Sequence, residues 1–271
     1  MKLILISLIM ASIFSTNPLG GLPPGTSTEL PIIMYHALEN NPNNPWEITA
    51  SEFENDLKWL AENGYNAVFM QDVINFVHHG LPLPEKPIVL SFDDGRHPTI
   101  DILLPLLEAY DSRISMSIVG SFTDKHSQIV GENNEIFHPH MTWENVRNAQ
   151  ASGRVEIQSH TYDLHGAKGA GRKGGESHES YRTRLLEDLA KFAEVLQQHT
   201  GLSANTLAYP LGIFSENSDE IIKEAGYLAS LSCSHKSNSI TVGDTEGLFL
   251  LNRYLRAPNK PLSSIIGGRS E

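Results

Sequence analysis

The clearest pattern along the chain is a series of short apolar runs that alternate with helical patterns from Pro31 onward, without an internal repeat. Several runs are continuously apolar, as expected for strands of a parallel sheet that is buried on both faces. Such an alternation predicts successive βα units. The strands we expect are 31–35, 66–70, 87–92, 113–119, 155–159, 206–209, 228–233 and 249–254.

Helices are predicted between these strands from apolar spacing and from terminal signals. Residues 179–199 carry one apolar stripe at spacings of three and four, formed by Leu185, Leu189, Phe192 and Leu196. Residues 51–54 read as a capping box, and Gly64 is the matching stop. A helix over 100–110 contains Pro105, which predicts a kink or an early break.

The N-terminal segments differ in composition from the rest of the chain. Residues 1–15 begin with one lysine and continue as an apolar run too short to span a bilayer comfortably, which predicts a secretory signal peptide. An uncleaved membrane anchor or a buried N-terminal element would explain the same run. Residues 16–30 are rich in Ser, Thr, Pro and Gly and are expected to form a flexible leader. The folded domain is therefore expected over residues 31–271.

Composition and charge restrict the classes of function. Of the 271 residues, 40% are hydrophobic, which is the balance of a folded protein, and the length suits one α/β domain. The net charge of −12 has the wrong sign for holding phosphate backbones, so nucleic acid is not an expected partner. Cys233 is the only cysteine, so no intrachain disulfide can form.

A pair of adjacent carboxylates is the strongest local chemical signal. The apolar run 88–92 ends in Asp93 and Asp94, followed by Gly95. Carboxylates at the carboxyl end of a parallel strand lie where α/β folds place their sites. Adjacent strand residues point to opposite faces, so a turn at Gly95 is needed before both can serve one centre. One aspartate could then bind a cation while the other handles protons.

A second polar cluster follows the predicted strand 155–159. His160 and His165 lie within it, together with Asp163. Two imidazoles and a carboxylate could form a three-ligand zinc site that leaves one position open for water. A spacing of five residues puts the two histidines on different faces of any regular element, so they converge only if the chain after His160 is irregular. Glycines are frequent in the loop 166–175 that follows, which is expected to be mobile.

Taken together, the order and content of several motifs resemble the polysaccharide deacetylases, carbohydrate esterases built on the chitooligosaccharide deacetylase domain. The resemblance covers roughly Pro31 to Arg256. It is carried by Ser91-Phe92-Asp93-Asp94-Gly95, by residues 114–122, by Thr142-Trp143, by Ser159 to His165, and by Tyr209-Pro210-Leu211-Gly212.

This resemblance implies an α/β fold with a distorted (β/α) barrel of about seven strands in a single domain. It also implies a divalent metal, usually Zn²⁺, held by Asp94, His160 and His165, with Asp93 as the general base. Four residues separate the two histidines where the usual family pattern has three. That spacing is similar to the branch that includes bacterial poly-N-acetylglucosamine and related envelope deacetylases.

Some positions depart from the pattern of the family. The arginine that orients the base is missing from the Tyr209-Pro210 motif, and Arg253 on the last predicted strand could replace it. Leu211 stands where a tyrosine is common, but the contact attributed to that position is a backbone N–H, which Leu retains. No histidine follows His235, so the usual C-terminal general acid has no clear counterpart, and His36 is a candidate replacement.

The function implied is a metal-dependent hydrolase, secreted or in the cell envelope, that removes N-acetyl groups from a polysaccharide containing N-acetylglucosamine and releases acetate. Two alternatives remain open at this point. One is a catalytically impaired relative that binds carbohydrate, which the missing arginine and histidine would suit. The other is a glycosidase on a similar barrel, although its paired carboxylates would have to flank a bond from opposite sides. No stable membrane span is expected once the signal peptide is removed.

Overall fold

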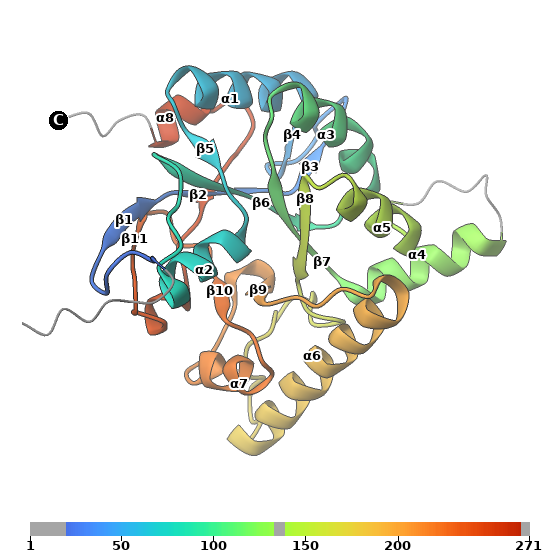
Figure 1. The fold of residues 1–271 in the computed structure, drawn as a ribbon. Helices are drawn as coiled ribbons and strands as arrows, with labels where there is room; N and C mark the ends of the chain where they lie inside the picture. The colour runs from blue at the N-terminus through green and yellow to red at the C-terminus, as the bar shows by residue number, and fades with distance from the viewer. Residues whose placement is uncertain (1–19, 133–138, 267–271) are drawn as a thin grey trace, which may run out of the picture.

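Seven parallel strands form a curled sheet at the centre of the structure (Figure 1). The computed structural model describes residues 20–132 and 139–266, so the expected signal peptide, 1–15, lies outside the described residues. The strands in sheet order are β10 (Ala229–Leu231), β9 (Thr206–Ala208), β8 (Val155–Ser159), β7 (Ile114–Ile118), β6 (Pro87–Asp94), β2 (Ile32–Tyr35) and β12 (Tyr254–Leu255). A short strand, β5 (Asn66–Ala67), also pairs in parallel with β6.

The two ends of the sheet approach each other through the segment before β12. Leu251 forms an isolated parallel bridge with Leu231 of β10, and its N–H donates to the carbonyl oxygen of Ser230 over 2.9 Å. Three residues later, Tyr254 of β12 is in register with Ile33 of β2. The single strand expected over 249–254 is therefore divided between two neighbours. The predicted distorted barrel of about seven strands is confirmed.

Helices cover the outside of the curled sheet, with α1 beside α8 and α6 beside α7 (Figure 1). The apolar stripe predicted for the longest helix is buried against the sheet. The helices are α1 (Ala50–Glu62), α2 (Met70–His79), α3 (His97–Ala109), α4 (Gly120–Glu132), α5 (Trp143–Ala151), α6 (His178–Thr200), α7 (Ser218–Glu224) and α8 (Leu262–Ile266), with short 3₁₀ turns η1 (Pro210–Gly212) and η2 (Glu246–Leu248).

The capping box of α1 begins two residues earlier than the sequence suggested. The N-cap is Thr49, whose hydroxyl accepts from the N–H of Glu52, while the Glu52 carboxylate accepts from the N–H of Thr49 over 2.9 Å. Both Thr49 and Ser51 have a glutamate three residues on, so the sequence pattern could not choose between them. Glu54 instead accepts from the hydroxyl of Tyr110.

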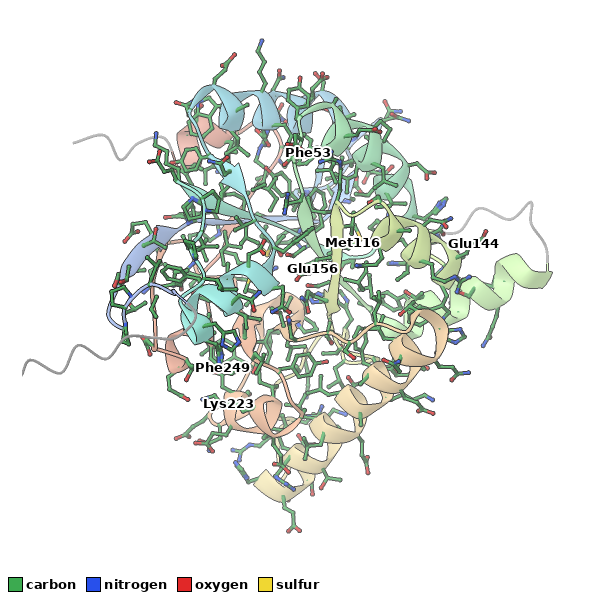
Figure 2. The ribbon with its side chains drawn as sticks, in the orientation of Figure 1. Phe53, Met116, Glu144, Glu156, Lys223 and Phe249 are labelled. Atoms are coloured by element: carbon green, nitrogen blue, oxygen red, sulfur yellow. The ribbon has the colours of Figure 1, made fainter. Side chains whose placement is uncertain are left out.

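The strand expected over 66–70 ends early because α2 begins at Met70. The carboxylate of Glu156, labelled in Figure 2, accepts from the backbone N–H groups of Met70 and Gln71 over 3.0 Å each. Helix N-termini leave such donors without partners, and a carboxylate there is favoured by the helix dipole. A partly buried carboxylate of β8 therefore fixes where α2 starts.

Helix α3 runs without interruption through Pro105, so the predicted early break is wrong. A proline inside a helix costs about 3 kcal/mol. Leu103 and Leu107 are both completely buried on the same helix, and each contributes about 1.5–3 kcal/mol by burial. Packing of α3 thus outweighs the cost of the proline.

Two small sheets lie outside the barrel. Strand β1 (Ser27–Leu30) pairs antiparallel with β11 (Asn238–Thr241), which gives the last residues of the expected leader a defined structure. Strand β3 (Ala37–Leu38) pairs with β4 (Glu47–Ile48) directly after β2. The latter pair shapes the loop that connects β2 to α1.

Candidate active site

The polar residues that the sequence singled out meet in one cavity of about 620 Å³ at the carboxyl ends of the parallel strands. Burial and stacking fix the ends of two of these strands. Tyr35 of β2 and Phe92 of β6 are in register, and their rings stack with centroids 4.8 Å apart. The residues that follow them, His36 and Asp93, therefore emerge side by side into the cavity.

Asp94, His160 and His165 place one ligand atom each within 4.8 Å of one another. Nε2 of His165 lies 3.0 Å and Nε2 of His160 lies 3.5 Å from the same oxygen, Oδ1 of Asp94. Two ligand atoms that are each about 2.0–2.1 Å from a tetrahedral Zn²⁺ would be about 3.3 Å apart. The distances from Asp94 to His165 and from Asp94 to His160 are therefore both compatible with binding of one cation by these residues.

Hydrogen bonding around these ligands also fits a cation. The Nδ1–H of His160 donates to the carbonyl oxygen of Ala208 over 2.8 Å, which leaves the lone pair of Nε2 directed at the site. Among the described residues, the buried Oδ1 of Asp94 has Nε2 of His165 at 3.0 Å and Nε2 of His160 at 3.5 Å as its polar neighbours. A buried carboxylate oxygen that faces two imidazole nitrogens suits a metal ligand.

The pKa values of these three residues also depend on their contacts with one another and on burial. Burial alone would raise the pKa of Asp94, but the contacts with His165 and His160 hold that pKa well below its usual range. Burial lowers the pKa of His160 and favours its neutral form. Contact with Asp94 raises the pKa of His165, so a bound cation would displace a proton there.

Left-handed backbone conformations make this convergence possible. Asp94 has φ 72° and Gly95 has φ 64°, so the chain turns at the end of β6 and the two aspartates no longer diverge. Thr161, directly after His160, has φ 71°, which supplies the irregular chain that the spacing of the histidines required. A Cβ at Gly95 would lie 2.8 Å from Cγ2 of Ile118, so this turn also needs the absence of a side chain.

Asp93 is paired with Arg253 beneath the cavity. Nη1 of Arg253 lies 2.8 Å from Oδ1 of Asp93 and 2.9 Å from Oγ of Ser91, and its Nε–H donates to the carbonyl oxygen of Ser232 over 2.8 Å. Burial would raise the pKa of Asp93, but the Arg253 guanidinium outweighs that effect and lowers it. Arg253 thus lies directly beside Asp93, where it could take the role of the arginine that is missing from the motif.

His36 and Leu211 line the same cavity. Nδ1 of His36 is buried and has no hydrogen-bond partner among the described residues. Leu211 has φ 58°, and its side chain is 54% exposed at the end of β9. The structure therefore brings together all seven residues proposed from the sequence: six line the cavity, and Arg253 supports it from below.

Trp46, Arg96, Cys233 and His235 also line the cavity, and the sequence reasoning did not assign them to it. Arg96 and His235 each follow the carboxyl end of a strand, so the rule that located Asp93 and His160 could have found them. Trp46 lies in the loop between β3 and β4, and no regular spacing in the sequence indicates it.

The glycine-rich loop after His165, which the sequence predicts to be mobile, makes several contacts with the rest of the fold. Ala170 is completely buried, and the side chain of Arg184 binds both the carboxylate of Glu176 and the carbonyl oxygen of Gly171. A Cβ at Gly169 would lie 2.7 Å from the carbonyl oxygen of Pro210. The loop is thus packed against the segment that carries Leu211.

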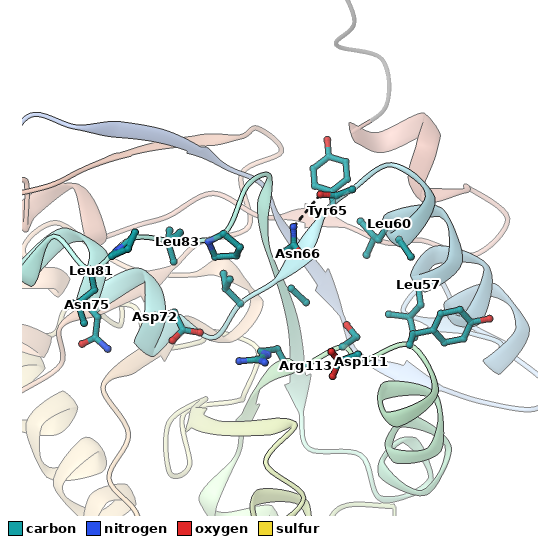
Figure 3. A pocket seen from close by; sticks show the side chains of 18 residues that line it. Leu57, Leu60, Tyr65, Asn66, Asp72, Asn75, Leu81, Leu83, Asp111 and Arg113 are labelled. Atoms are coloured by element: carbon teal, nitrogen blue, oxygen red, sulfur yellow. Dashed lines mark hydrogen bonds between the residues drawn. The ribbon is translucent and has the colours of Figure 1, made fainter. Parts of the chain in front are cut away.

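A cavity of about 660 Å³ lies near the amino ends of β6 and β7, away from the site (Figure 3). Its carboxylates have structural partners: Asp72 accepts from the N–H of Phe69, and Asp111 pairs with Arg154. Within the described residues, the only group of metal-ligating side chains lies in the other cavity. The cavity at the carboxyl ends of the strands is therefore the candidate functional site.

An aspartate and two histidines at the strand ends of this curled parallel barrel are a donor set that could hold one metal ion. Residues 80–230, more than half of the chain, match the family described as polysaccharide deacetylase. The chain belongs to that family.

Individual relatives agree with this family. The chain is 29% identical to the poly-β-1,6-N-acetyl-D-glucosamine N-deacetylase of Escherichia coli K12 over 66% of its own length, but it covers only 30% of that protein. It is 24% identical to the enzyme of the same name from Staphylococcus aureus MSSA476, over 71% of this chain and 63% of that one. A solved de-N-acetylase structure from Aggregatibacter actinomycetemcomitans superposes with a TM-score of 0.74 at 26% identity, over 89% of this chain and 99% of that one.

Proposed function

We propose that this protein is a metal-dependent hydrolase that removes N-acetyl groups from a polysaccharide containing N-acetylglucosamine and releases acetate. The observation that carries the proposal is the convergence of Asp94, His160 and His165 beside Asp93, which is paired with Arg253. The names of the Escherichia coli and Staphylococcus aureus relatives support poly-N-acetylglucosamine as the substrate.

Asp94, His160 and His165 would hold the cation, with Zn²⁺ favoured by a donor set of two imidazoles and one carboxylate. When bound, such a cation polarises a carbonyl and lowers the pKa of water. Three protein ligands leave a coordination position open, as catalytic zinc sites require.

The residues of the chain would then divide the proton transfers between them. Asp93, kept ionised by Arg253, takes the proton of the attacking water. The backbone N–H of Leu211 donates to the acetamide oxygen as that oxygen gains negative charge. His36 gives a proton to the nitrogen of the leaving sugar amine, so the C–N bond breaks to acetate and a free amine.

The two alternative functions, a glycosidase and a catalytically impaired relative that binds carbohydrate, explain less of the geometry of the site. A glycosidase needs two carboxylates on opposite sides of a bond, whereas Asp93 is bound to Arg253 and Asp94 faces two histidines. An impaired relative is suggested by the missing arginine and the missing C-terminal histidine, but Arg253 lies beside Asp93 and His36 lines the same cavity.

Secretion or location in the cell envelope belongs to the same proposal. It is supported by the apolar run over 1–15, which lies outside the described residues. Within 20–132 and 139–266, no helix has both the length and the apolar character needed to cross a bilayer. A polysaccharide is the proposed partner, and the charge of −12 argues against nucleic acid.

The decisive experiment measures acetate released from poly-N-acetylglucosamine, chitooligosaccharides and peptidoglycan, together with bound metal. Asp93→Asn should keep the metal and lose on the order of 10²–10⁴ in rate, because an amide cannot take the proton of the water. Asp101→Asn on α3, whose side chain is 72% exposed, is the matched control and should retain wild-type turnover. Undiminished turnover in Asp93→Asn would exclude Asp93 as the base, and no acetate from any glycan with the metal-loaded wild type would refute the proposed function.

A further inference from the structure

An exposed tryptophan lies at the edge of the candidate active site. Trp46 exposes 48% of its surface and lines the cavity that contains Asp93 and Asp94. Tryptophan is highly buried on average, because water does not solvate its large apolar rings well. A ring left open in a cavity with polar groups on one side is typical of a surface that a ligand covers.

The backbone on both sides of Trp46 is held in place. Its N–H donates to Oδ1 of Asn44 over 2.9 Å, and its carbonyl oxygen accepts from the N–H of Ala37 over 3.4 Å. The next residue, Glu47, is in register with Ala37 in the pair of β3 and β4. The indole is therefore carried by a turn whose backbone is held in place directly before β4.

Trp46 is placed on the side of the cavity where the proposed acid lies. The centroids of the Trp46 and His36 rings are 5.2 Å apart, with the rings tilted by 49°. In the order of the sheet, β6 and β8 with their metal ligands lie between β2, which leads to His36, and β9, which leads to Leu211. In the proposed reaction His36 protonates the leaving nitrogen, and the sugar that carries this nitrogen would then lie on the Trp46 side.

We propose that Trp46 is the stacking platform for the pyranose ring whose acetamide is cleaved. The C–H groups on one face of a β-linked glucosamine ring form a flat apolar surface that matches an aromatic ring, while its hydroxyl edge meets polar groups such as Asn44 and Glu47 in the same wall. This subsite rests on the proposed function, since it takes the substrate class from it. It would make Trp46 a residue that determines specificity for a sugar ring over other acetylated groups.

The test compares a sugar substrate with a substrate that lacks a sugar. Kinetics would be measured on a β-linked N-acetylglucosamine pentasaccharide and on p-nitrophenyl acetate, for wild type, Trp46→Ala and Trp46→Phe. Trp46→Ala should raise KM for the pentasaccharide roughly tenfold or more, the size of effect seen when an aromatic anchor is removed, while kcat changes little. The ester should lose far less, and Trp46→Phe should restore most of the affinity. Leu81→Ala, exposed to a similar degree at 47% but outside the cavity, is the control.

Direct binding separates this subsite from the proposed reaction. Calorimetric titration of the pentasaccharide would be made in the Asp93→Asn background, with and without Trp46→Ala, so that nothing is turned over. A weaker affinity only with Trp46→Ala supports the platform even if no acetate is ever released by the wild type. An unchanged affinity, or an equal loss of rate on ester and pentasaccharide, overturns it, because the indole would then only hold His36 in place.

Discussion

Replacement of Arg253 by Met tests whether the buried ion pair beneath the cavity stabilises the fold in addition to holding Asp93, the proposed base. The Arg253 side chain is 0% exposed and Asp93 is 2% exposed, so neither charge is compensated by water. Met fills much of the same volume but removes the hydrogen bonds to Asp93, Ser91 and Ser232. The carboxylate of Asp93 would then be buried without its cation.

The expected loss is large compared with the stability of a domain. Breaking a buried pair by removing one partner costs about 3–5 kcal/mol, out of a total of about 5–15 kcal/mol. Removing both charges in Asp93→Asn/Arg253→Met should recover about 2 kcal/mol or more relative to Arg253→Met, since no charge is then left unpaired.

Urea denaturation at pH 7 measures this loss, with metal removed from every variant so that occupancy does not differ. Arg154→Met is the matched control, because that guanidinium pairs with Asp111, whose side chain is 90% exposed, and should cost less than about 1 kcal/mol. If Arg253→Met cost as little as the control, or the double variant were no more stable than Arg253→Met, the pair would not stabilise the fold as argued.

Three further predictions concern the acid, the metal and the anchored loop. His36→Ala should lower turnover about a hundredfold or more with metal content intact; an unimpaired rate on an acetamide substrate would assign the proton to Asp163 or to bound water. The purified protein should carry about one divalent metal per chain, and both His160→Ala and Asp94→Asn should lose it by elemental analysis; unchanged content in both would refute this ligand set. Hydrogen bonds from Arg184 lower the pKa of Glu176 from 4.5 to about 2, so this carboxylate stabilises the fold fully above about pH 4.5 and progressively less toward pH 2. Glu176→Gln should therefore lower the urea midpoint at pH 7 and differ less from wild type at pH 3, and a difference independent of pH would contradict the pairing.

The parts of the site that the sequence predicted share one physical origin. Buried parallel strands are continuously apolar, so a polar cluster at the end of such a run marks the edge of the sheet where sites form. This rule identified Asp93, Asp94 and His160, and the family resemblance added Arg253 and His36. The structure places all five in or against one cavity.

Other features depend on partners distant in the chain and could not be predicted from local composition. Residues 27–30 belong to a stretch rich in Ser, Thr, Pro and Gly, yet they form β1 because they pair with β11, more than 200 residues later. The position of the exposed Trp46 was also not predictable from local sequence, because it is set by the pairing of β3 with β4. Local patterns describe what a segment prefers, whereas these segments take the structure that the rest of the fold imposes.

Three residues with strained backbone conformations surround the candidate active site. Asp94, Thr161 and Leu211 have φ between 58° and 72° without being glycine, and they lie at the ends of β6, β8 and β9 around one cavity. The left-handed region costs such residues about 1–2 kcal/mol each, so three of them cost about 3–6 kcal/mol. Local bonds offset part of this cost, since the Thr161 hydroxyl accepts from the N–H of Leu164 and the Nδ1–H of His140 donates to the carbonyl oxygen of Asp94. Regular strand ends would direct adjacent side chains to opposite faces. The left-handed residues at these strand ends therefore allow the polar side chains of separate segments to converge on one site.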